Sequence, residues 1–226
     1  MTDPRRAGRI IGALLLLQML GSALVNFGLE RPLFDPPGFL VNATLHASQI
    51  GLAALVGLVI ETLWIGIAVT LFPFAFARAR ALTLWLVALA GVCVAVAVIE
   101  NGSVMSMLSL SNAYATANGV ERQDLESVRV AVAAARNWTH FLARMLDGCT
   151  TFVLMAGFYR CALIPRALAA WALAATVLQV IGVGMPLFGR PVNFLLLAPT
   201  GLTLLLVAAV LLVTGLHERA SFGMSS

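Results

Sequence analysis

The stretch Ser48–Phe76, SQIGLAALVGLVIETLWIGIAVTLFPFAF, decides the fold class, because its only charged residue is Glu61. The hydrocarbon core of a bilayer is about 30 Å thick, and a helix needs roughly 20 apolar residues to cross it. Five further apolar runs of sufficient length occur along the chain, so we predict an all-α transmembrane bundle of six helices. The expected spans are residues 10–29, 48–76, 82–110, 138–159, 164–185 and 194–216.

The composition of the whole chain agrees with this prediction. Of its 226 residues, 61% are hydrophobic and only 11% are charged, and the mean hydropathy is +0.97. A soluble domain carries about 25% charged residues, so soluble enzymes, nucleic-acid-binding proteins, disordered chains and disulfide scaffolds are excluded. The residues outside the spans are too few for a soluble domain. We therefore expect one transmembrane domain over residues 1–226, with membrane lipids and no nucleic acid as partners; the oligomeric state stays open.

The arginines at the ends of the spans predict the orientation. Cytoplasmic loops of membrane proteins carry an excess of basic residues. With the N-terminus in the cytoplasm, eight arginines lie inside and Arg144 falls within a span. The five arginines that then lie outside are Arg31, Arg122, Arg129, Arg136 and Arg190. This count favours a bacterial cytoplasmic-membrane protein with both termini inside.

Two connections between spans are longer than the others. Residues 30–47 contain Pro32, Pro36 and Pro37, which indicates an ordered turn rather than a helix. In the other connection, Asn118 and Glu121 resemble a helix N-cap with its reciprocal acid. We expect an interfacial helix on the outer face over about residues 121–136.

An internal duplication is visible when the chain is shifted by 86 residues. The segment Arg80–Trp85, RALTLW, then overlays Arg166–Trp171, RALAAW, and Glu61 falls on Asp147. Self-similarity at a fixed period is typical of repeated structural units. Chance similarity between alanine- and leucine-rich helices is the alternative. A true repeat would make spans two and three equivalent to spans four and five, as tandem hairpins.

Ionisable side chains inside the spans are the candidates for function, because each costs about 2.5–3.5 kcal/mol to insert and usually faces the bundle interior. At 100° per residue, a polar stripe on span four falls within about 80° of the helix surface. The stripe consists of Asn137, His140, Arg144, Asp147 and Thr151. It indicates either an intramembrane salt bridge that joins helices or a polar site.

The other polar side chains of the spans lie between the membrane centre and the outer leaflet, so we expect a cavity that opens to the outside. The predicted substrate-binding residues are Asn26, Glu61, Glu100, Asn101, Asn137, His140, Arg144, Asp147 and Thr151. The candidate catalytic residues are Glu61, Asp147, His140 and Arg144. Three carboxylates in the spans face a single guanidinium, so we expect either a protonated acid or a bound cation. The sequence contains no P-loop, HExxH or GxSxG motif, and we predict no metal and no cofactor.

Three features stand in a recognisable order along the chain: Arg9–Gly12 (RIIG), Gly157–Arg166 (GFYRCALIPR) and Pro199 early in the last span. Together they resemble a bacterial membrane family known as domain of unknown function 4386. The order and spacing of these segments carry the resemblance, which covers about residues 8–217. It implies six helices, and because the family has no established activity it implies no catalytic residue.

Three classes of function stay open at this point. An integral membrane protein that binds or moves a small molecule or an ion accounts for the repeat and the acids within the spans. An intramembrane enzyme acting on a lipid-like substrate accounts for the cluster of acids, arginine and histidine. A structural or regulatory membrane protein accounts for all the charges if they only join helices.

Overall fold

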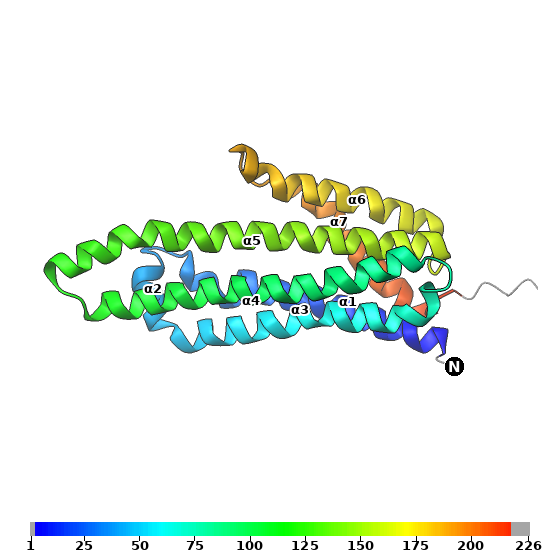
Figure 1. The fold of residues 1–226 in the computed structure, drawn as a ribbon, viewed down its shortest axis with the longest axis horizontal. Coiled ribbons are helices and arrows are strands. Elements are labelled where there is room, and N and C mark those ends of the chain that lie inside the picture. The colour runs from blue at the N-terminus through cyan, green and yellow to red at the C-terminus, as the bar shows by residue number, and fades with distance from the viewer. Residues whose placement is uncertain (1–2, 218–226) are drawn as a thin grey trace, which may run out of the picture. The chain divides into compact units, whose positions relative to one another are not determined.

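A computed structural model of the protein describes residues 3–217, which contain helices and no strands (Figure 1). The elements are α1 (Pro4–Ala23), the π-helical segment η1 (Leu24–Leu29), the 3-10 turn η2 (Arg31–Leu33), α2 (Phe39–Leu45), α3 (Ala47–Ala75), α4 (Arg80–Thr116), α5 (Gly119–Cys161), α6 (Arg166–Gly184), the 3-10 turn η3 (Met185–Phe188) and α7 (Phe194–Thr214). Within the described range, six helical segments are long and apolar enough to cross a membrane. The predicted all-α, six-span architecture is therefore confirmed.

The two long connections differ from the sequence-based expectation. Residues 121–136 are not a separate helix but the first part of α5, which continues to Cys161. Neither glycine nor proline occurs between residues 120 and 147, so nothing interrupts the helix. Residues 30–47 contain the short helix α2 in addition to turns.

The described chain divides into two compact units. The first unit comprises residues 3–16, 65–89 and 147–217, and the second comprises residues 17–64 and 90–146. Several long helices contribute to both units, so the units are not successive segments of the chain.

Close backbone contacts hold the first unit together. The hydroxyl of Thr200 on α7 donates to the carbonyl of Ala175 on α6, at 2.8 Å. A methyl group added at Gly12 of α1 would lie 2.9 Å from the carbonyl oxygen of Ala208 on α7. Small residues at helix contacts allow this approach, which is the usual way in which helices associate in lipid.

The second unit has an apolar cluster that joins its first loop to the hairpin of α4 and α5. Its buried members are Leu33, Phe39, Leu40, Ala43, Ile50, Val104, Met107 and Leu108, and Val132 and Ala133 of α5 pack against them. The hydroxyl of Ser111 on α4 accepts from the backbone N–H of Thr44 and donates to the carbonyl of Leu40, both at 2.9 Å. Apolar and polar contacts thus fix this loop to α4.

The segments that suggested a duplication both begin helices. α4 starts at Arg80 and α6 starts at Arg166, and Trp85 and Trp171 are both exposed. Their helices differ in length, with 37 and 19 residues. The duplication stays a prediction.

Candidate functional site: a buried charge network

Three basic side chains lie four residues apart on α5, within the second unit. They are Arg136, His140 and Arg144. Four residues advance a helix by about 400°, so the three side chains follow one another on the same face with a rotation of about 40° at each step. One face of α5 therefore presents a column of three groups that can carry positive charge.

Each of these side chains meets a carboxylate from a different element. Arg136 donates to Glu30, which follows η1. His140 Nδ1 lies 2.6 Å from Glu100 Oε1 on α4. Arg144 Nη2 lies 3.1 Å from Glu61 Oε1 on α3 and 3.4 Å from Glu100 Oε2. We call these six residues the charge network.

Most of the charge network is removed from solvent. Glu30 is 3% exposed and Arg136 is 5% exposed, Glu61 and Glu100 are buried, and His140 and Arg144 are partly buried. Buried ions must lose their hydration, and only good geometry and further hydrogen bonds offset that cost. The carboxylate of Glu100 meets this requirement because it accepts from both His140 and Arg144.

The π-helical segment η1 places two of the polar groups. Asn26 lies within it, where its side-chain amide donates to the carbonyl of Ser22 at 2.8 Å, and Glu30 follows it directly. Gln49 of α3 donates to the carbonyls of Gly28 and Leu29 at 3.2 and 3.1 Å. π-Helical turns are rare and are frequently found at functional sites. Here the segment brings the carboxylate of Glu30 to Arg136.

A cavity of about 20 Å³ adjoins the charge network. Its lining residues are Ser22, Val25, Asn26, Glu30, Gly57, Ile60, Glu61, Ala97, Glu100, Asn101 and Arg144. A site of this volume with several polar groups can hold roughly one water molecule or one small ion. Gly57 leaves room for Asn101, since a methyl group at that position would lie 3.1 Å from Asn101 Oδ1.

The structure places the predicted site residues in three groups. Asn26, Glu61, Glu100, Asn101 and Arg144 line this cavity, and His140 contacts it through Glu100. Asn137 is exposed on α5. Asp147 and Thr151 belong to the first unit, where both are buried.

Sequence analysis missed two members of the charge network, Glu30 and Arg136. Glu30 adjoins the predicted end of the first span, where a carboxylate is unremarkable. The arginine count places Arg136 in an outer loop, although it precedes His140 by four residues and so lies on the same face of a helix. That spacing was the available signal for Arg136, whereas nothing in the local sequence marks Glu30.

The family model of the domain of unknown function (DUF4386) matches residues 10–215. The chain belongs to the DUF4386 family. Comparisons with curated proteins and with solved structures found no match. The six apolar helices of this DUF4386 protein agree with the architecture that the resemblance implied.

The charges of the network in this DUF4386 protein do not balance when its histidine is neutral. Glu30, Glu61 and Glu100 supply three carboxylates, whereas Arg136 and Arg144 supply two guanidinium groups. Arginine stays protonated in proteins, so the adjustable charges are those of the acids and of the imidazole. One proton on His140, or one cation in the cavity, balances the formal charges of these six residues.

Proposed function

We propose that this integral membrane protein handles ions, and that the charge network is its proton-binding site. The observation that carries the proposal is the excess of one carboxylate over the guanidinium groups in a buried network that includes a histidine. Histidine is the side chain whose ordinary titration range covers physiological pH. Uptake of one proton at His140 removes the excess negative charge.

The hydrogen bond between His140 and Glu100 indicates where that proton binds. An ionised carboxylate can only accept, so Nδ1 of His140 carries a hydrogen and donates it to Glu100. Nε2 is then the acceptor of the second proton. Glu100 stabilises the resulting imidazolium directly.

The volume of the cavity favours a proton or a small ion over an organic substrate. About 20 Å³ accommodates one water molecule, whereas sites for organic ligands measure roughly 300–1,000 Å³. This difference argues against the lipid-processing enzyme that the sequence also allowed.

The proposed membrane placement follows the arginine count. Because Arg136 belongs to the buried network, four of the five arginines assigned to the outer loops remain there, against eight assigned to the cytoplasm. We propose a bacterial cytoplasmic membrane with both termini inside. The charge network then faces the outer half of the membrane.

Histidine-selective NMR provides the test. The chain has only three histidines, His46, His140 and His217, so ¹⁵N-histidine labelling in lipid nanodiscs gives few signals, and His140→Gln assigns the relevant one. The proposal requires that the His140 ring exist both as imidazolium and as neutral imidazole when the pH of the buffer is varied. A His140 ring that keeps one protonation state as the pH is varied contradicts the proposal and favours a purely structural network.

Two glutamate variants supply the matched comparison. Glu100→Gln removes the carboxylate that His140 Nδ1 contacts and is expected to change the His140 ring signals. Glu126→Gln removes an exposed carboxylate of the same unit and is expected to leave them unchanged. Proteoliposomes with an enclosed pH dye then test transport, because a proton carrier acidifies them under an inward proton gradient and His140→Gln abolishes that signal.

A further inference from the structure

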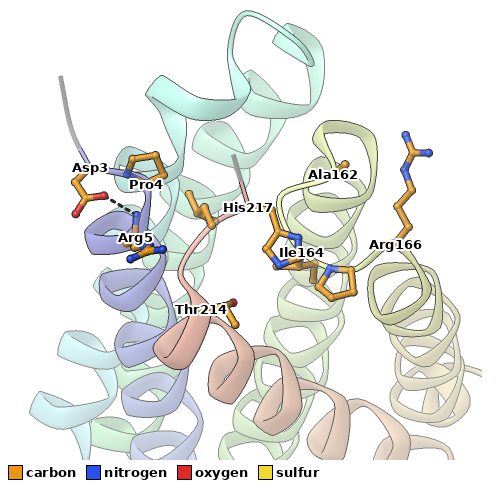
Figure 2. A pocket seen from close by; sticks show the side chains of 10 residues that line it. Asp3, Pro4, Arg5, Ala162, Ile164, Arg166, Thr214 and His217 are labelled. Carbon is orange, nitrogen blue, oxygen red and sulfur yellow. Dashed lines mark hydrogen bonds between the residues drawn. The ribbon is translucent and has the colours of Figure 1, made fainter. Parts of the chain in front are cut away.

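A pocket in the first unit is lined by none of the residues of the charge network. It has a volume of about 690 Å³ and lies where the beginning of α1, the turn between α5 and α6, and the end of α7 meet (Figure 2). The lining residues are Asp3, Pro4, Arg5, Ala162, Ile164, Pro165, Arg166, Thr214, Leu216 and His217. Its volume is in the usual range for ligand sites.

Specific backbone contacts build the walls of this pocket. The N–H of Leu216 donates to the carbonyl of Pro4 at 3.2 Å, and the N–H of His217 donates to the carbonyl of Leu163 at 2.8 Å. These two bonds tie the end of α7 to the beginning of α1 and to the α5–α6 turn. Three segments that are distant in the sequence are thus held around one space.

Two residues beside the pocket have a backbone conformation that is uncommon. Ala162 has a φ of 51°, which is rare for a residue with a side chain. Gly215 has a φ of 75°, and a methyl group there would lie 2.5 Å from the Cα of Arg5. Glycine adopts a positive φ without strain. The strained backbone of Ala162 is of the kind that is retained where the surrounding structure imposes it, and often at ligand sites.

The polar side chains of the pocket favour an anion. Figure 2 shows Arg5 on the α1 side and His217 between α1 and the beginning of α6, from which the side chain of Arg166 extends away from His217. Both arginines are exposed. Asp3 is the one acid in the lining, and its Oδ1 already accepts from the N–H of Arg5 at 2.9 Å. The lining therefore carries a net positive charge, which rises further when His217 is protonated.

The beginning of α6 adds to the positive potential. Its N-cap is Pro165, which provides no side-chain hydrogen bond, and its first turn contains no acid. Free N–H groups and the helix dipole at such an end favour negative charge. Ile164, Pro165 and Leu216 supply apolar surface beside the charged groups.

We propose that this pocket binds a phosphate-bearing anion, with Arg5 and Arg166 as the ligand-binding cations. The phosphodiester of an anionic phospholipid and a soluble phosphate share this chemistry. Basic pockets between helices at the cytoplasmic surface are suited to lipid headgroups, and these helix ends are the ones that the arginine count assigns to that surface. The proposal does not depend on the charge network, which lies in the other unit.

Native mass spectrometry of the full-length protein in neutral detergent tests the proposal. Phosphatidylglycerol, phosphatidylcholine and inorganic phosphate are added separately, and the affinity of each is measured for the wild type and for Arg5→Gln/Arg166→Gln. An arginine near a membrane surface contributes on the order of 1 kcal/mol, so we expect the double variant to lose about 30-fold in affinity for the anionic ligand. The control is Arg6→Gln/Arg160→Gln, which removes two exposed arginines of the same unit that do not line the pocket.

The outcomes separate the sources of the phosphate. Selective retention of phosphatidylglycerol, lost in the test variant and kept in the control, supports a lipid headgroup. Binding of inorganic phosphate with the same pattern supports a soluble ligand. Equal losses in both double variants, or equal binding of phosphatidylcholine and phosphatidylglycerol without phosphate binding, overturn the proposal. Should the double variant unfold, Arg166→Gln alone is used, because Arg166 is exposed and begins α6.

Discussion

The first unit has eight arginines and two acids among its described residues, whereas the second has five arginines and seven acids. All eight arginines of the first unit are exposed. In the second unit, by contrast, Arg136 and Arg144 are drawn inside and bind carboxylates. Two parts of one apolar chain thus use their few charges differently.

The difference shows two physical roles for a charge in a membrane protein. An exposed arginine at a helix end keeps its hydration and contributes to orientation and to binding of anions. A buried arginine loses hydration and must be paired, so it constrains which helices meet. The two units also differ in how their helices are held together. Helices of the first unit approach each other closely at glycines, whereas the second unit adds side-chain ion pairs and hydrogen bonds.

The largest expected effect comes from removing one member of a buried pair. Arg136→Ala leaves the carboxylate of Glu30 buried without its cation, and we expect the free energy of unfolding to fall by about 3–5 kcal/mol. The measurement is reversible unfolding in mixed micelles. Arg9→Ala in the first unit removes an exposed arginine and is expected to change stability by less than about 0.5 kcal/mol.

A second substitution separates the loss of the pair from the cost of the orphaned charge. In Arg136→Ala/Glu30→Gln the uncompensated carboxylate is gone, so the double variant is expected to recover part of the lost stability. The outcome that contradicts coupling is a loss of unfolding free energy in the double variant equal to the sum of the losses in Arg136→Ala and Glu30→Gln. The two units would then differ in where their charges lie, but not in whether those charges are paired.

The next effect tests the backbone contacts of the first unit. A methyl group at Gly8 would lie 2.3 Å from the backbone nitrogen of Leu216, and 2.5 Å from Cα of Gly215. Backbone atoms cannot move aside as a flexible side chain can, so we expect Gly8→Ala to destabilise by about 2–3 kcal/mol. Gly201→Ala on α7 is the control. A methyl group at Gly201 would have no atom within 4 Å other than those of its chain neighbours and its own helix backbone, and alanine favours a helix. A Gly8→Ala variant as stable as the control contradicts the close-packed arrangement.

The apolar helices of the fold could be predicted from the sequence because membrane insertion depends mainly on length and hydrophobicity. The predicted span at 48–76 and the helix Ala47–Ala75 differ by one residue at each end. The polar stretch before the fourth span was harder to predict, since alternating charges suit both a helix at the interface and the first turns of a longer helix. The absence of glycine and proline from Val120 to Asp147 decides for the long helix.

The site could be predicted only in part. Glu61, Glu100 and Arg144 stand out because a charge in an apolar span is costly. Asn137 was predicted to lie in the site, whereas the structure places its neighbour Arg136 there. Which of the two side chains faces the end of the first span depends on how α5 is rotated about its own axis. The angles between residues along one helix do not specify that rotation. The place of Glu30 depends on the π-helical turn before it, which is a property of the packed structure.

The smallest expected effect compares two ion pairs of the second unit. Arg31 and Asp35 form a pair at 3.2 Å, but their side chains are 71% and 51% exposed, unlike the buried pair of Arg136 and Glu30. Water and salt screen an exposed pair, and ordering its side chains costs entropy. We therefore expect Asp35→Asn to change the free energy of unfolding by less than about 1 kcal/mol, with a dependence on ionic strength. The unfolding measurement is repeated at low and high salt. A loss as large as that of Arg136→Ala would show that burial is not what distinguishes the two pairs.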